Sequence, residues 1–236
     1  MTPFGFRSNL SFPHCETEMK LLHLDSSILD GNSITRTLSA AVVADLRVRH
    51  PSAEVTYRDL VSDEIAHLTG PIAAGFRDVA TDAFDDDAIR EHRVSDTLVT
   101  EFLASDVIVI GAPMYNFSVP SQLKAWLDRI AQAGRTFRYT EHGPVGLASG
   151  KCVIVASARG GFYAEGPPAG MDFQENYLNR FFGFLGVTDV RFVRAEGASK
   201  GQPVRDEGIA LARAAIADVL ADVLAGVPAP DARPVK

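Results

Sequence analysis

The chain has 236 residues, 46% of them hydrophobic and 22% charged, which is typical of a soluble globular protein and suits one α/β domain. The formal net charge of −7 repels polyanions, so nucleic acid is not an expected partner. No apolar stretch approaches the roughly 20 residues that a membrane span requires, so no membrane partner is expected either.

Strand and helix patterns alternate in the N-terminal part of the chain. A short apolar run at 19–25 predicts the first strand. The apolar spacing of residues 34–49 is helical, with Ser33 at the N-cap position and Pro51 after the last turn. Alternating apolar and polar residues at 54–60 then predict a second strand.

A long polar segment precedes the most apolar strand of the sequence. Residues 61–105 are expected to be mostly helical, and the acidic run Asp85–Asp87 suits the N-terminus of a helix that ends near Ala104. Residues 106–113 are apolar and rich in β-branched side chains, as in a parallel strand buried on both faces. A helix is expected at about 120–131, with its proline in the first turn.

The C-terminal part continues the alternation. Residues 137–147 predict an inserted hairpin, 151–158 a buried strand, 172–185 a helix, 188–197 a strand and 204–225 the last helix. Five strands that alternate with helices indicate an α/β doubly wound parallel sheet. In the flavodoxin-like version of this fold, the strand order is 2-1-3-4-5.

The predicted domain spans residues 19–226. Residues 1–18 are expected to be a disordered extension, and the Pro-rich residues 227–236 a frayed tail. The two cysteines, Cys15 and Cys152, form no disulfide framework, so a reducing compartment and a cytoplasmic protein are expected. No pair among the six histidines has zinc-ligand spacing, and no metal site is expected.

Three loops are candidates for a binding site. Ligands of such sheets lie beyond the carboxyl ends of the strands, where the strand order reverses. The loops after the first, third and fourth strands of the sheet are residues 26–37, 111–121 and 157–163. All three are rich in glycine, hydroxyl groups or flat polar side chains, and we expect them to meet.

The first loop predicts an anion site. Ser26, Ser27, Ser33 and Thr35 bring hydroxyl groups to the N-terminus of a helix, where free N–H groups favour phosphate. The loop has neither the P-loop lysine motif nor G-x-G-x-x-G, which leaves a monophosphate, and FMN fits. The alternative is that Ser33 only caps the helix.

The other two loops predict a planar ligand. Met114, Tyr115, Asn116 and Phe117 offer aromatic and thioether walls with backbone amides, although large apolar side chains beside a strand can also be core. The glycines of Arg159–Gly161 allow a close backbone approach, or form an ordinary turn.

The sequence resembles the FMN-dependent NADH azoreductases, which are also NADH:quinone oxidoreductases, from Met19 to about Leu224. The most specific segments are SSILDGNSITR, GAPMYNFSVPSQLKAWLDRI, FRYTEHGPVGL with GK after it, and ARGGFYAEGP followed by MDFQENYL. The resemblance implies an FMN cofactor, NADH as donor, and a homodimer with the flavin at the subunit interface. It implies no catalytic side chain, because the chemistry takes place at N5 of FMN.

The resemblance also implies roles for individual residues. Ser27 and the turn Ser33-Ile34-Thr35 would hold the FMN phosphate, and Met114 to Phe117 would run along the isoalloxazine. The pyrimidine side would lie against Ala158, Arg159, Gly160 and Gly161. The family usually has serine where this chain has Ala158, so backbone contacts without a side-chain hydroxyl contact are expected there.

The expected activity is a ping-pong reduction of quinones and azo compounds, with NADH as the electron source. The flavin supplies the chemistry and the protein supplies binding and orientation. One alternative is a flavodoxin-type electron carrier, which the hairpin and the long Gly/Pro loop at 162–170 disfavour. Another is an NADPH-dependent quinone reductase, since no residue identifies a reader of the ribose 2′ position. No G-x-S-x-G motif supports a hydrolase.

Overall fold

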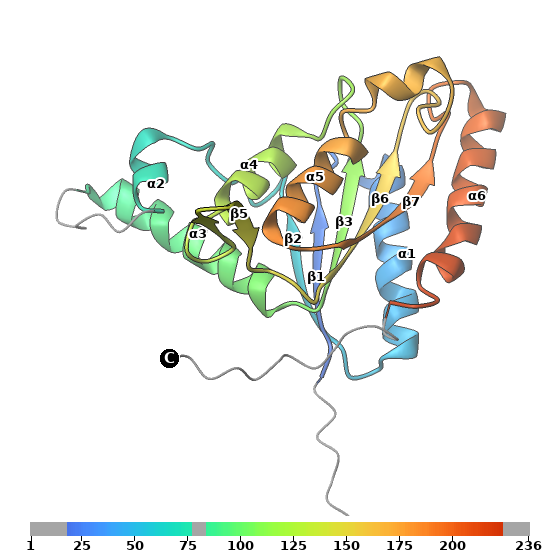
Figure 1. Cartoon of the computed structure of the whole chain (residues 1–236). Coiled ribbons are helices and arrows are strands. Elements are labelled where there is room, and N and C mark those ends of the chain that lie inside the picture. Colours follow the sequence, from blue (N-terminus) through green and yellow to red (C-terminus); the bar gives the residue numbers. More distant parts are fainter. Residues whose placement is uncertain (1–17, 77–83, 224–236) are drawn as a thin grey trace, which may run out of the picture.

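A computed structural model describes residues 18–76 and 84–223. Its centre is a parallel sheet in the order β2-β1-β3-β6-β7, so the predicted flavodoxin-like sheet and its 2-1-3-4-5 order are confirmed (Figure 1). The strands are β1 Lys20–Asp25, β2 Glu54–Asp59, β3 Val107–Pro113, β6 Cys152–Ala158 and β7 Asp189–Ala195.

Helices cover both faces of the sheet (Figure 1). On one face lie α1 (Ile34–Arg49) and α6 (Gln202–Val219), and on the other α3 (Asp86–Ala104), α4 (Ser121–Ile130) and α5 (Glu175–Leu185). A short helix α2 (Gly70–Ala74) packs beside α3. In the described part of the chain, no helix is long and apolar enough to cross a membrane.

Strand β3 shows why its sequence is apolar at every position. Val107 and Val109 belong to the core under α1 and α6, whereas Ile108 and Ile110 belong to the core under α3, α4 and α5. All four side chains are fully buried. A strand covered on both faces has no solvent side, and its sequence therefore does not alternate.

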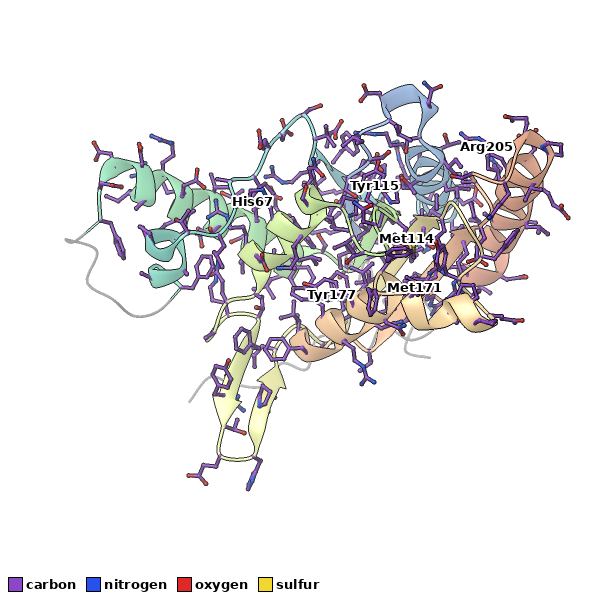
Figure 2. The ribbon with its side chains drawn as sticks, turned by 90° about the horizontal axis from the view of Figure 1, so that it is seen from above. His67, Met114, Tyr115, Met171, Tyr177 and Arg205 are labelled. Carbon is purple, nitrogen blue, oxygen red and sulfur yellow. The ribbon has the colours of Figure 1, made fainter. Side chains whose placement is uncertain are left out.

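The predicted hairpin is also present. Strands β4 (Phe137–Thr140) and β5 (Gly143–Gly146) pair antiparallel and project from the body of the domain (Figure 2). Its base is held by the backbone N–H of Ala148, which donates to the carbonyl of Leu185 at 2.9 Å.

Several predicted boundaries differ from the structure. In 61–105, helix is confined to α2 and α3 among the described residues. The helix expected from residue 172 begins at Glu175, because the Asp172 carboxylate accepts from the N–H groups of Gln174 and Glu175 and ends the preceding turn.

Two more boundaries differ, and two predictions cannot be compared. Pro120 precedes α4 instead of lying in its first turn, and α6 covers 202–219 instead of 204–225. The extension predicted at 1–18 lies outside the described residues except for Glu18, and the tail predicted at 227–236 lies wholly outside them.

Gly111 in β3 permits a close approach of β1 and α1. A Cβ at this position would lie 2.3 Å from Oδ1 of Asp25, whose side chain is buried. We expect Gly111→Ala to lower the free energy of unfolding by about 1–3 kcal/mol through overpacking, measured by urea denaturation. The control is Gly183→Ala in α5, where an added Cβ meets nothing within 4 Å and should raise stability by up to about 1 kcal/mol. Equal effects of the two variants would contradict this account.

Candidate functional site

The three predicted loops meet at the carboxyl edge of the sheet. Both the N–H and the hydroxyl of Ser26 donate to the carbonyl of Gly111, at 3.1 and 2.7 Å. The N–H of Met114 donates to the carbonyl of Ala158 at 2.8 Å. The structure therefore joins the loops after β1, β3 and β6 directly, as the strand order requires.

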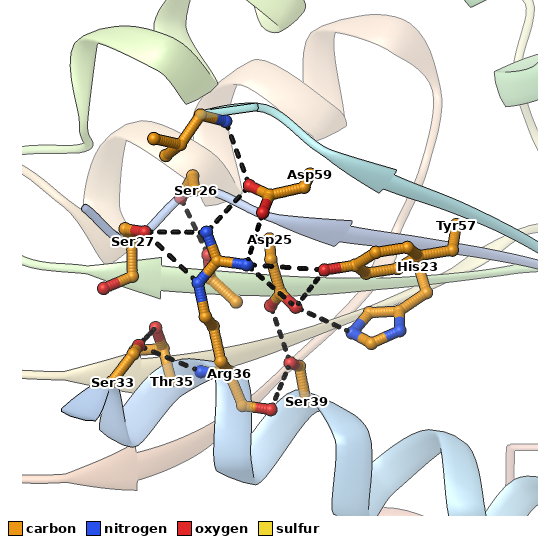
Figure 3. Close-up of polar contacts among 12 residues, drawn as sticks. His23, Asp25, Ser26, Ser27, Ser33, Thr35, Arg36, Ser39, Tyr57 and Asp59 are labelled. Atoms are coloured by element: carbon orange, nitrogen blue, oxygen red, sulfur yellow. Dashed lines mark hydrogen bonds and ion pairs between the residues drawn. The ribbon is translucent and has the colours of Figure 1, made fainter. Parts of the chain in front are cut away.

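The first loop places buried hydroxyl groups at the N-terminus of α1. Ser33 Oγ caps the helix by accepting from the N–H of Arg36 at 3.2 Å, and it lies 3.1 Å from Thr35 Oγ1 (Figure 3). Ser27, Ser33 and Thr35 are all at most 3% exposed. The side chain of Ile34 packs into the core under α1, so only its backbone faces this loop. The cap and the hydroxyl cluster are both present, which makes this end of α1 suitable for an anion.

Arg36 fixes the shape of the first loop, a role that the sequence did not reveal. Its Nε and Nη2 donate to the carbonyl of Ser27 at 3.2 and 2.8 Å, and its guanidinium pairs with Asp59 at 2.7 and 2.8 Å (Figure 3). The Arg36 contact lowers the pKa of Asp59 to about 2. Arg36 thereby connects α1 both to the loop after β1 and to the end of β2.

A buried carboxylate lies next to this bridge. Tyr57 donates its hydroxyl to Asp25 Oδ2 at 3.2 Å, and burial, followed by the charge of Asp25, raises the pKa of Tyr57 to about 12 (Figure 3). Ser39 on α1 donates to Oδ1 of the same carboxylate at 2.8 Å. These contacts hold β1, β2 and α1 together directly below the loop.

The second loop contains a tight turn in a strained conformation. Tyr115 and Ser118 exchange two backbone hydrogen bonds, at 3.0 and 3.1 Å, around Asn116 and Phe117, whose φ angles are 48° and 72°. Positive φ at both central residues is the geometry of a type I′ turn, which asparagine tolerates and phenylalanine does not favour. The Phe117 carbonyl accepts from the N–H of Phe173 at 3.1 Å, which helps to hold the turn. Strain of this kind concentrates at ligand sites.

A cavity of about 750 Å³ opens beside this turn. Its walls are Ile28, Met114, Tyr115, Asn116, Ser118, Val119, Ser121, Lys124 and Tyr177. This volume lies within the usual range for a small-molecule site. Met114, Tyr115 and Tyr177, which all line the cavity, are labelled in the view from above (Figure 2).

Tyr115 connects the cavity to the first loop. Its hydroxyl accepts from the N–H of Ile28 at 3.3 Å and lies 3.5 Å from Ser27 Oγ. Ile28 and Tyr115 both line the cavity, while Ser27 carries one of the buried hydroxyl groups of the first loop. The first loop and the cavity are therefore adjacent.

The side chain of Arg159 in the third loop is engaged by buried carboxylates. The guanidinium of Arg159 is buried and pairs with Glu175, with Asp172 at 3.0 Å and with Glu196 at 3.3 Å. Ser157 does not replace the hydroxyl missing at Ala158, because its Oγ donates to Glu175 at 2.8 Å.

Packing explains why residues 160 and 161 are both glycine. A Cβ at Gly160 would lie 2.8 Å from Ser199 Oγ, and one at Gly161 would lie 3.2 Å from the ring of Tyr163. The two glycines thus let the loop close against its neighbours.

The loops around the cavity also expose large apolar side chains. Those more than a third exposed are Ile28, Leu29, Phe117, Phe162, Met171 and Phe173. Across the ranges 18–76 and 84–223, no group of three or more His, Cys, Asp and Glu side chains could hold a metal ion.

Comparisons with known proteins agree with this geometry. The family model described as flavodoxin-like fold matches residues 19–220. An FMN-dependent NADH:quinone oxidoreductase of Ralstonia nicotianae is 60% identical over 88% of this chain and 100% of its own length. The FMN-dependent NADH:quinone oxidoreductase 2 of Xanthomonas axonopodis pv. citri is 59% identical over 89% of this chain and 97% of its own. The crystal structure of an azoreductase from Bacillus anthracis superposes with a TM-score of 0.78 at 29% identity, covering 85% of this chain and 98% of that one.

Proposed function

The chain belongs to the FMN-dependent NADH:quinone oxidoreductase family, and on that basis we propose that it binds FMN and uses NADH to reduce quinones and azo compounds. The observation that carries the proposal is the junction at Tyr115, where a buried hydroxyl cluster adjoins a cavity with aromatic and thioether walls. A ligand that joins a phosphate to a planar ring suits both parts.

The residues present fit this cofactor. Ser27, Ser33, Thr35 and the backbone of Ile34 would hold the phosphate, because they surround the N-terminus of a 16-residue helix. Met114, Tyr115, Asn116 and Phe117 would lie along the ring system. Backbone groups of Ala158, Arg159, Gly160 and Gly161 would lie at the pyrimidine edge of the ring system. The Arg159 side chain instead pairs with the buried carboxylates of Asp172 and Glu175. FMN, when bound, supplies the two-electron redox chemistry.

A shared cavity is consistent with the proposed ping-pong order. The ring system and a substrate stacked on it would both lie in the cavity beside the turn. If donor and acceptor stack on the same face of the ring, they occupy the same place in turn. The protein's part is to orient each planar molecule between the turn at Asn116 and the ring of Tyr177.

We also propose that the active form is a homodimer. The support is the group of exposed apolar side chains on the loops near the cavity, since a second copy would remove them from water. Sedimentation of the FMN-loaded protein would show one species of twice the chain mass, and a monomer would contradict the proposal. The cytoplasm, where NADH is produced, is the compartment that this activity requires.

One experiment separates the proposed function from its alternatives. The purified chain is titrated with FMN, and NADH oxidation is then followed with menadione and with methyl red. Turnover with parallel lines in double-reciprocal plots supports the ping-pong reductase. FMN binding without turnover would favour an electron carrier, and a higher kcat/KM with NADPH would favour the NADPH-dependent reductase. Failure to bind FMN would contradict all three.

Asn116→Asp tests the position of the ring. Aspartate also tolerates positive φ, so the turn should persist, but its negative charge would lie in the cavity wall beside a ring that gains negative charge when it is reduced. We expect FMN affinity, or the rate of cofactor reduction by NADH, to fall by about tenfold, which corresponds to about 1.4 kcal/mol. Asn179→Asp makes the same change at an exposed position of α5 and is the control. Equal kinetics in the two variants would exclude a ring next to Asn116.

A further inference from the structure

Lys124 brings a positive charge to a cavity whose other walls are uncharged. Of the residues that line the cavity in the described part of the chain, Lys124 is the one with a formal charge. The others are apolar, aromatic, hydroxyl or amide side chains. Lys124 lies on α4 behind Ser121, which also lines the cavity, and its side chain is 45% exposed.

The ammonium group of Lys124 already has a partner outside the cavity. It forms an ion pair with Asp128, one helical turn further along α4, whose side chain is 31% exposed. Such partly exposed i,i+4 pairs are worth only a few tenths of a kcal/mol. A bound anion can therefore compete with Asp128 for the same ammonium group.

Tyr177 on α5 contributes a neutral phenol to the same cavity. Burial, followed by the charge of Asp128, raises the pKa of Tyr177 to about 12, so the phenol stays protonated at physiological pH. Tyr177 can stack on a flat acceptor without adding charge. Among the residues that line the cavity, only the charge of Lys124 distinguishes an anionic acceptor from a neutral one of the same shape. The negative charge of Asp128 weakens the attraction of Lys124 for an anion.

We propose that Lys124 makes the enzyme select acceptors by charge, favouring aromatic molecules with a carboxylate or sulfonate on the ring over neutral ones. Asp128 sets the strength of this preference by competing for the ammonium group. The inference rests on the proposed function, because it concerns the acceptor in the same cavity.

The test compares two dyes that differ by one carboxylate. Methyl red carries it and p-dimethylaminoazobenzene does not. In the FMN-loaded protein, Lys124→Gln should lower the ratio of kcat/KM for methyl red to kcat/KM for the neutral dye by about fivefold. Asp128→Asn should shift the same ratio in the opposite direction, because it frees the ammonium group. High salt should weaken both effects through screening. Lys200→Gln, an exposed lysine elsewhere, should leave the ratio unchanged.

The outcomes distinguish the inference from the function on which it rests. If the wild type reduces neither menadione nor either dye with NADH, the proposed function fails and the inference fails with it. If it reduces menadione but neither dye, quinone reduction stands and the inference is overturned. If both dyes are reduced and the ratio is the same in Lys124→Gln and the wild type, only the inference is overturned. A change confined to kcat/KM for NADH would show that Lys124 acts on the electron donor and not on the acceptor, which would also overturn the inference. Urea denaturation of each variant shows that the ratio is measured on folded protein.

Discussion

A Ser33→Asp variant is expected to fold like the wild type and to bind FMN at least about 100-fold more weakly. Aspartate is as good an N-cap as serine, so the cap on the N–H of Arg36 should persist. Its carboxylate, however, would occupy the site proposed for the phosphate. Two like charges about 4 Å apart near a protein surface repel by about 4 kcal/mol, more than the roughly 2.7 kcal/mol that 100-fold requires. Quenching of FMN fluorescence measures the affinity, and urea denaturation measures the stability.

Ser33→Ala should give the reverse pattern. Loss of the cap should lower the free energy of unfolding by about 1 kcal/mol, while FMN affinity falls less than in the aspartate variant. Riboflavin, which lacks the phosphate, should bind the aspartate variant and the wild type equally well. If Ser33→Asp bound FMN as tightly as the wild type, the phosphate would have to lie elsewhere.

Arg159→Met should strongly destabilise the folded domain. Methionine keeps most of the side-chain length but removes the charge that Asp172, Glu175 and Glu196 share in the interior. Breaking a buried ion pair by removing one partner costs about 3–5 kcal/mol, because the remaining charge is buried without compensation. The unfolding midpoint in urea measures the decrease in the free energy of unfolding.

A matched control uses the same carboxylate. Arg194 also pairs with Glu175, at 2.8 Å, but its side chain is 45% exposed, so Arg194→Met should cost less than about 1 kcal/mol. Adding Glu175→Gln to Arg159→Met should recover part of the loss, because it removes one uncompensated charge. Similar losses in the two single arginine variants would show that burial does not decide the effect.

Much of the fold followed from the residues alone. The apolar run at 106–113 identified a strand buried on both faces, and β3 has that position. The alternation of strands and helices predicted the sheet, and the sheet in turn brought the three loops together at one edge. These inferences succeed because periodicity and helix signals are local, and because the parallel topology leaves few arrangements.

Only the tertiary structure revealed the roles of side chains whose contact partners are distant in the sequence. The sequence placed Arg159 in a loop near the cofactor, and only its distances to Asp172 and Glu196 show that its side chain is buried and engaged. Arg36 carried no recognisable motif, and its role follows from its contact with Asp59, 23 residues away. Nor could a sequence pattern show that Lys124 lines the same cavity as Tyr177. Local patterns specify where elements form, whereas burial and charge pairing exist only once those elements have packed.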